Sequence, residues 1–164
     1  MYFIKIYDMK KTSLLTVGIL LLTACHQQEN DPYAEARQRL QDFAEAYFNY
    51  DYQRAAELIT PESKKYLRFA ASNITQQDID TLNAQEMPTA VEVTDYWQAP
   101  GDSTGTATVE VTDYLQKTTI GGGMELVDEA TFQLTVVERE GMYYVKMEGL
   151  PRSGRQSRGS VWDE

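Results

Sequence analysis

The sequence predicts an α+β domain in which helices pack on one face of an antiparallel sheet. Between residues 32 and 86, apolar residues recur at three- and four-residue steps, as they do along one side of a helix. After Pro88 the period changes to two, as in strands that have one buried and one solvated face. Helices that precede a meander of strands are typical of the α+β class. We expect about four strands, with the first helix covering the apolar face of the sheet.

Residues 1–24 have the order of a secretory signal peptide. Lys10 and Lys11 precede an apolar run over residues 14–22, and small residues follow. A membrane-spanning helix needs about 20 consecutive apolar residues, and this run is about half that length. We therefore interpret the segment as a cleaved signal and not as a permanent anchor. Met9 begins a signal of ordinary shape, so we expect translation to start there, with Met1 as the alternative.

The end of this leader reads Leu22-Thr23-Ala24-Cys25, which resembles the lipobox of bacterial lipoproteins. The resemblance implies that the Cys25 thiol is joined to diacylglycerol and that the new amino terminus is acylated. Each buried methylene contributes about 0.8 kcal/mol, so two or three acyl chains hold a protein durably at a bilayer. We expect a lipid-anchored protein of the cell envelope, in the outer membrane, with the leaflet left open. The alternative is an ordinary signal followed by an incidental cysteine.

The cysteine count and the net charge limit the partners of the exported domain. Cys25 is the only cysteine, so the domain itself can form neither a disulfide nor a thiolate metal site. The chain has a net charge of −10, and removing residues 1–24 takes away three lysines and one aspartate, which leaves −12. Such a field repels nucleic acid and anionic head groups. We expect no nucleic-acid partner, and we attribute the charge to solubility.

Two polar segments flank the expected domain over residues 32–150. Residues 25–31 comprise the lipidated cysteine and a tether that reaches about 20 Å when fully extended. Glu29-Asn30-Asp31 resembles a weak surface-export signal, and the alternative is a plain spacer that faces the periplasm. Residues 151–164 are polar and contain glycine, so we expect a disordered tail.

The domain begins with an amphipathic helix of about 17 residues. Asp31 can cap it, and Pro32 suits its first turn. Its apolar side is expected to contain Ala36, Leu40, Phe43, Ala44 and Tyr47. A break at residues 49–51 then leads to a second, short helix that includes residues 55–59.

Two further helical segments follow. Thr60 can cap a third helix, because Pro61 fits the first helical position. The apolar side of this third helix is expected to contain Tyr66, Leu67, Phe69 and Ala70. Residues 75–86 are more polar and are helix or loop, and the spacing of Thr75 and Asp78 indicates a capping box.

Four strands are predicted by the period-two alternation, at residues 91–97, 106–112, 130–136 and 142–150. Three turns separate them, at residues 100–102, 121–123 and 138–141. In the third strand Phe132 and Leu134 alternate with Gln133 and Thr135, so one face is buried. The glycine run at 121–123 lacks the strand-to-helix setting and the downstream lysine of a phosphate loop, so we interpret it as a turn.

The order of the elements and two local phrases resemble the small lipoproteins of the NTF2-like, cystatin-like superfamily. The phrases are YDYQRAAELITPES at residues 50–63 and GMYYV at residues 141–145, and the likeness spans most of residues 32–150. The resemblance implies a cone-shaped sheet wrapped on the long helix, often around a pocket. Members of this family include isomerases and dehydratases as well as non-catalytic binding modules. The fold therefore does not choose the function, and the site must.

The expected domain contains few kinds of side chain that could act in catalysis. His26 is the only histidine and lies next to Cys25, outside the expected domain, which removes histidine acid–base chemistry, a Ser/His/Asp triad and a histidine metal site. We expect no metal and no cofactor. An isomerase or lyase would have to pair a carboxylate with a tyrosine. The candidates for such pairs are Asp95, Asp113 and Asp128 with Tyr47, Tyr66, Tyr96 and Tyr114.

Aromatic residues are the more informative feature, because aromatic walls with a few hydroxyls are typical of ligand sites. The candidate pocket residues are Tyr47, Tyr50, Tyr66, Tyr96, Trp97 and Tyr114. The alternative is that they are ordinary core and rim residues. We expect a non-catalytic accessory module that binds a small apolar ligand or a protein partner, with an isomerase or lyase and a structural envelope spacer as the two alternatives.

Overall fold

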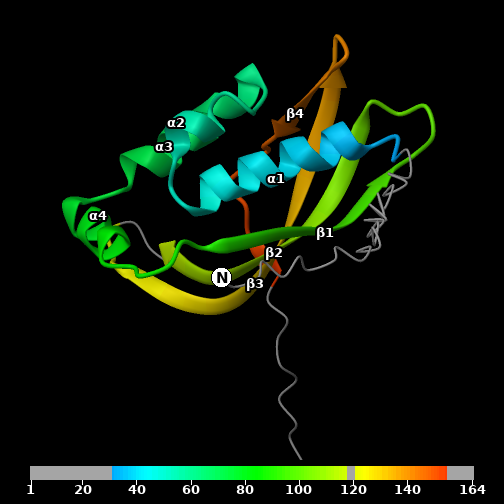
Figure 1. Cartoon of the computed structure of the whole chain (residues 1–164). Coiled ribbons are helices and arrows are strands. Elements are labelled where there is room, and N and C mark those ends of the chain that lie inside the picture. Colours follow the sequence, from blue (N-terminus) through cyan, green and yellow to red (C-terminus); the bar gives the residue numbers. More distant parts are fainter. Residues whose placement is uncertain (1–30, 118–120, 155–164) are drawn as a thin grey trace, which may run out of the picture.

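The computed structural model describes residues 31–117 and 121–154. It confirms the predicted α+β class, since helices pack against an antiparallel sheet (Figure 1). Residues 1–30, for which we predict a signal peptide, a lipidated Cys25 and a tether, lie outside the described residues, as do residues 118–120 and 155–164. Within the described part of the chain, no helix has both the length and the apolar character needed to span a bilayer.

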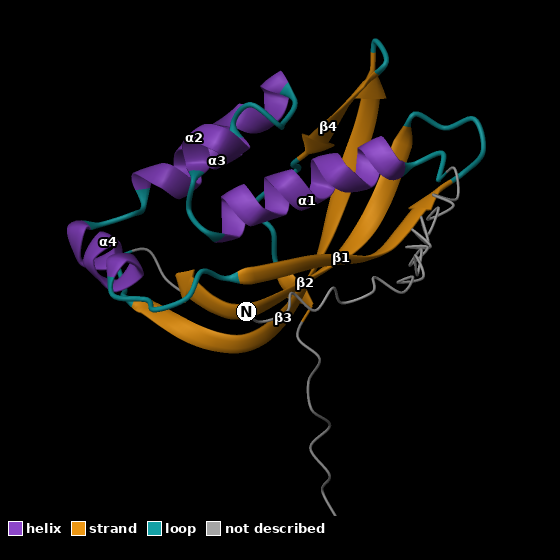
Figure 2. Cartoon of the chain, in the orientation of Figure 1, coloured by secondary structure: helices purple, strands orange, loops and turns teal. Residues whose placement is uncertain are grey.

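The first helix, α1 (Ala34–Phe48), lies across the inner face of the sheet (Figure 2). Its buried side consists of Ala36, Leu40, Phe43, Ala44, Ala46, Tyr47 and Phe48. The helix starts slightly later than predicted, because the Asp31 carboxylate accepts a hydrogen bond from the Tyr33 backbone N–H at 2.9 Å in a turn before the helix. The predicted apolar stripe is therefore correct, although the predicted cap is not.

The helix α2 (Tyr52–Ala55) begins earlier than the predicted segment at 55–59. Its start is set by Asp51, whose carboxylate accepts a hydrogen bond from the Arg54 backbone N–H at 3.0 Å. The residues after it, up to Ile59, run to the edge of the sheet instead of forming helix. There the Thr60 N–H donates to the Val145 carbonyl at 3.0 Å.

The 3-10 turn η1 (Pro61–Ser63) leads directly into α3 (Lys64–Ser72), as the Thr60-Pro61 pattern predicts. Leu67 and Ala70 are buried, but Phe69 is 50% exposed, so the apolar side of α3 is narrower than expected. The predicted capping box begins α4 (Gln76–Asn83).

The sheet consists of β1 (Ala90–Gln98), β2 (Thr104–Lys117), β3 (Met124–Arg139) and β4 (Met142–Lys146), antiparallel in that order. The strands β2 and β3 are much longer than predicted. They pair from Thr104 opposite Val137 to Lys117 opposite Met124. The alternation that predicts strands is interrupted near Asp113, which has a positive φ of 54° and is followed by two buried residues in succession.

The last strand is shorter than predicted. It ends at Lys146, and the chain then leaves the sheet and returns as β5 (Ser153–Gly154), which pairs with Thr131 and Phe132 of β3. The chain therefore stays attached to the sheet beyond Leu150, the predicted end of the domain.

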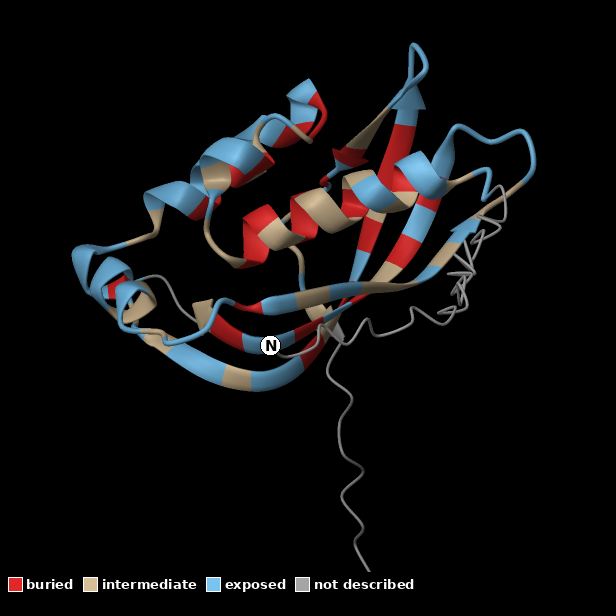
Figure 3. Ribbon diagram, in the orientation of Figure 1, coloured by how far each residue is buried: buried red, intermediate tan, exposed pale blue. Residues whose placement is uncertain are grey.

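The core lies between α1 and the sheet. Figure 3 shows buried positions along the underside of α1 and the middle of the long strands. The Phe48 ring is fully buried and its centroid lies 4.5 Å from that of Phe132 and 5.2 Å from that of Tyr114. Side chains therefore fill this part of the interior by direct ring-to-ring contact.

Candidate functional site

The six aromatic residues predicted to line a pocket do not form one group. Tyr47, Tyr50 and Tyr114 lie close enough to one another to interact near the end of α1, and Tyr52 joins them. The ring of Tyr52 lies 5.7 Å, centroid to centroid, from the rings of both Tyr47 and Tyr50. Tyr50 has a positive φ of 63°, and its hydroxyl donates to the Leu115 carbonyl. We call these four tyrosines the tyrosine cluster.

The tyrosine cluster keeps its hydroxyls neutral. Tyr47 and Tyr114 are buried, and burial raises the pKa of all four phenols above the ordinary value of 10. A phenol whose pKa is raised in this way can donate a hydrogen bond but does not act as a base at neutral pH. The cluster is therefore suited to packing and to orienting neighbours.

The other three predicted residues lie elsewhere. Tyr96 contacts Tyr33, with ring centroids 5.3 Å apart, and the Arg37 guanidinium lies 5.5 Å from its ring centroid. Trp97 is 67% exposed. Tyr66 lies on α3, with the Lys65 ammonium 4.8 Å from its ring centroid. None of these contacts joins the tyrosine cluster.

The aspartates predicted to pair with a tyrosine are on the surface. Asp95, Asp113 and Asp128 are all exposed. Within the described residues the buried carboxylate is Asp78, which is 1% exposed. Its partners are the Lys117 ammonium and the Thr75 hydroxyl and N–H, so its hydrogen bonds go to no tyrosine.

The Asp78 site joins α4 to the far end of β2. Burial alone would raise the pKa of Asp78, but hydrogen bonds from Lys117 and Thr75 outweigh burial, so the pKa lies below its ordinary value of 3.8. Lys117 also donates to the Gly122 carbonyl at 2.8 Å. The Oδ1 atom of Asp78 has no hydrogen-bond partner within the described structure. Sequence reasoning found the cap but missed Lys117, because 39 residues separate the two side chains.

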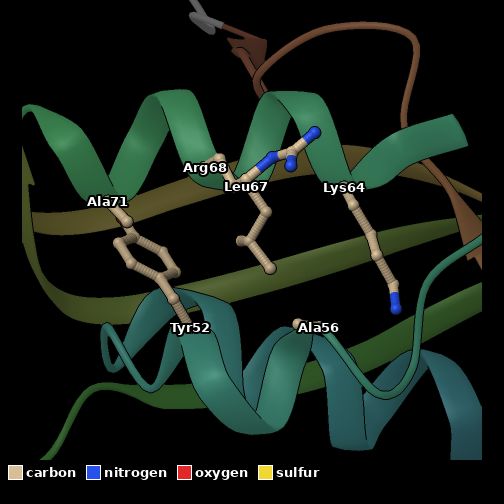
Figure 4. Close-up of a pocket in the computed structure, with 6 residues that line it drawn as sticks. All are labelled: Tyr52, Ala56, Lys64, Leu67, Arg68 and Ala71. Carbon is tan, nitrogen blue, oxygen red and sulfur yellow. The ribbon is translucent and has the colours of Figure 1, made fainter. Parts of the chain in front are cut away.

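A groove lies between α2 and α3, with a volume of about 270 Å³ (Figure 4). We call it the α2–α3 groove, and it is lined by Tyr52, Ala56, Lys64, Leu67, Arg68 and Ala71. In Figure 4 the Tyr52 ring extends from α2 toward Ala71, and Leu67 extends from α3 toward α2. Leu67 is 3% exposed and supplies an apolar floor. Lys64 and Arg68 are exposed and lie at the rim.

Buried polar contacts hold the α3 side of this groove in place. Ser63, at the start of α3, is fully buried, and its hydroxyl accepts a hydrogen bond from the Met147 N–H at 2.8 Å. The same oxygen lies 2.7 Å from the Thr60 hydroxyl, which is also buried. The start of α3 is therefore fixed to the chain that follows β4.

The groove was not among the sequence predictions, although part of its pattern is visible there. Residues 64, 67, 68 and 71 follow the three- and four-residue steps of one helical face. Local patterns do not show that α2 approaches α3. This approach brings Tyr52 of α2 and Ala56, the residue that follows α2, to the groove. The chain matches no known protein family and no curated protein.

Proposed function

We propose that the chain is a lipid-anchored lipoprotein of the cell envelope whose domain binds a small apolar ligand without transforming it. The observation that carries the binding half of the proposal is the α2–α3 groove. Its floor is Leu67, Ala56 and Ala71 add apolar lining, and the Tyr52 ring forms one wall. Concave apolar surface with a few polar groups is typical of small-molecule sites.

The anchor half of the proposal is supported by the sequence at Cys25. The basic start, the short apolar run and the Leu-Thr-Ala-Cys exit occur in the order that lipoprotein signals require. Only five residues separate Cys25 from Asp31, where the described chain begins, so an acylated Cys25 would keep the domain close to its bilayer.

We also propose that the domain is NTF2-like. A long first helix that crosses the inner face of a curved antiparallel meander supports this assignment (Figure 2). Such domains serve many functions, so the assignment adds nothing to the choice of function. A catalytic aspartate and tyrosine pair gains no support from the exposed positions of Asp95, Asp113 and Asp128.

Metabolic labelling tests the anchor. Cells that express the full chain are supplied with an alkyne fatty acid, and the Cys25→Ser variant is compared with the wild type. The wild type should incorporate label and sediment with envelopes, and the variant should do neither, because the serine hydroxyl cannot form the thioether. Equal labelling of both proteins would overturn the anchor.

Titration with octan-1-ol tests the groove. We expect the NMR signals of the Ala56 and Ala71 methyl groups to shift, because these groups line the groove. Ala71 is exposed, so Ala71→Trp should fill the groove without unfolding the domain and should abolish the shifts at Ala56. Ser72→Trp is the matched control, since Ser72 is the next residue on α3, is also exposed and lies outside the lining. Binding that survives Ala71→Trp, or no binding by the wild type, would contradict the proposal.

A further inference from the structure

The rim of the α2–α3 groove carries positive charge in an acidic protein. The chain has a net charge of −10, yet α3 contains Lys64, Lys65 and Arg68 and no acidic residue. A local excess of one sign against the overall field is a feature that solubility does not explain.

The three cations of α3 lack an ion-pair partner, as do Arg39 and Arg152, whereas the other five cations of the described residues have one. Arg37, Arg54, Lys117, Arg139 and Lys146 each lie within 4 Å of a carboxylate oxygen. Across residues 31–117 and 121–154, none of the three α3 cations has such a partner. Their charges are therefore available to an anion from outside the chain.

Two of these cations lie on the groove. Lys64 and Arg68 are four residues apart, so they share one face of α3, and both line the groove above Leu67. Like charges at this spacing repel each other, and an anion between them would relieve that repulsion. In Figure 4 the Leu67 side chain lies between Tyr52, at one end of the groove, and Lys64, at the other end.

We propose that the α2–α3 groove binds a single-chain carboxylic acid of medium length. The carboxylate lies between the Lys64 ammonium and the Arg68 guanidinium, and the hydrocarbon chain contacts Tyr52 and Leu67. This inference rests on the proposed function, because it assigns a chemical class to the ligand of that same groove. Arginine presents paired donors that match a carboxylate, and lysine adds a point charge.

The size of the groove favours one short chain. Pockets for drug-sized ligands have volumes of about 300 to 1,000 Å³. The α2–α3 groove, at about 270 Å³, lies just below that range. A ligand with two long acyl chains would leave most of its apolar surface in water, whereas a single short chain is closer to the groove in size.

Separate titrations of the whole protein with octanoate and octan-1-ol test whether the groove prefers a carboxylate head group. The two ligands have the same chain length and differ in the anionic head group. The wild type should bind octanoate about tenfold more tightly, because charge-assisted hydrogen bonds form only to the carboxylate. The difference should shrink as salt concentration rises, since exposed charges are screened.

Variants distinguish the contribution of the two rim cations to the octanoate preference from the contribution of the overall positive charge of α3. The double change Lys64→Gln and Arg68→Gln should remove the preference, so that the affinity for octanoate falls to about the affinity for octan-1-ol. Lys65→Gln is the matched control, because it removes one charge from the same helix but its ammonium lies over Tyr66, away from the lining. It should keep most of the preference.

The possible failures are distinguishable. Equal affinity of the wild type for the two ligands would overturn the carboxylate inference and leave the apolar groove standing. A preference that Lys65→Gln abolishes as completely as the double change would also overturn it, because the effect would then be general charge. Binding of neither ligand would overturn the proposed function as well.

Discussion

Helices α1 and α4 are attached to the same sheet by different kinds of contact. Seven of the fifteen residues of α1 are buried, and all seven are apolar or aromatic. One of the eight residues of α4 is buried, and that residue is the charged Asp78. The first helix is therefore held to the sheet by the hydrophobic effect, and the last helix by the ion pair between Asp78 and Lys117 of β2.

The two kinds of attachment indicate which helix can separate from the sheet by itself. Apolar burial is shared among many contacts, so α1 should separate from the sheet only when the whole domain unfolds. A helix held by one buried charge depends on a single contact whose loss leaves an uncompensated charge. The α2–α3 groove lies on α3, which has two buried residues among its nine and is intermediate between these extremes.

The largest effect is expected in the core under α1. Phe48→Ala removes a fully buried ring that contacts Phe132 and Tyr114, and should lower the free energy of unfolding by about 4 kcal/mol. Urea denaturation measures this change in the free energy of unfolding. Phe69→Ala is the control, because this phenylalanine is 50% exposed and its loss should cost little. Similar losses for both would show that the core is not under α1.

The next effect concerns the attachment of α4. Asp78→Asn or Lys117→Met should each destabilise the domain by about 3 kcal/mol, because each leaves a buried charge without its partner. Combining the two changes should cost much less than the sum, as expected for partners in one interaction. Additive losses in urea denaturation would contradict a direct ion pair.

Acid should affect the same contact. The folded pKa of Asp78 lies below its ordinary value of 3.8, so the stabilisation is complete above that pH and is lost as pH falls through the folded pKa. Wild-type stability should therefore fall more steeply than that of Asp78→Asn when the pH drops below 3.8. The pKa values of Glu62 and Glu148 are also lowered, but these residues are present in both proteins and cancel in the difference. If the free energies of unfolding of the two proteins fall in parallel with pH, the Asp78 carboxylate does not contribute to the acid sensitivity.

The smallest effect is expected at Trp97. Its side chain is 67% exposed, so Trp97→Ala should change the free energy of unfolding by less than about 0.5 kcal/mol. Tyr47→Ala, at a buried position, should cost several times more. The sequence predicts that both residues line one pocket. Comparable losses in the free energy of unfolding for the two variants would contradict their different burial in the structure.

The order and class of the elements could be predicted because they depend on local periodicity. The stripe from Ala36 to Tyr47 and the Glu140-Gly141 hairpin are both visible in the sequence. Strand ends were less predictable, because the positive φ at Asp113 interrupts the alternation while pairing with β3 continues past it. The return of Ser153 to β3 depends on a tertiary contact that composition does not reveal.

The candidate site was less predictable than the fold. Aromatic content identifies tyrosines but not which face of the sheet each occupies, so Tyr114 and Trp97 looked equivalent. The α2–α3 groove needs two helices to meet, and the Asp78–Lys117 pair needs two distant segments to meet. Long-range pairs of this kind leave no trace in local patterns.

Amide hydrogen exchange compares the two attachments most directly. We expect the amides of Leu40, Phe43 and Phe48 in α1 to exchange only through global unfolding, whereas those of α4 exchange through a smaller, local opening. Asp78→Asn should speed exchange in α4 far more than global destabilisation alone explains. If the amides of α1 and α4 are equally protected from exchange, and Asp78→Asn lowers the protection of both helices equally, the two helices are not attached in different ways.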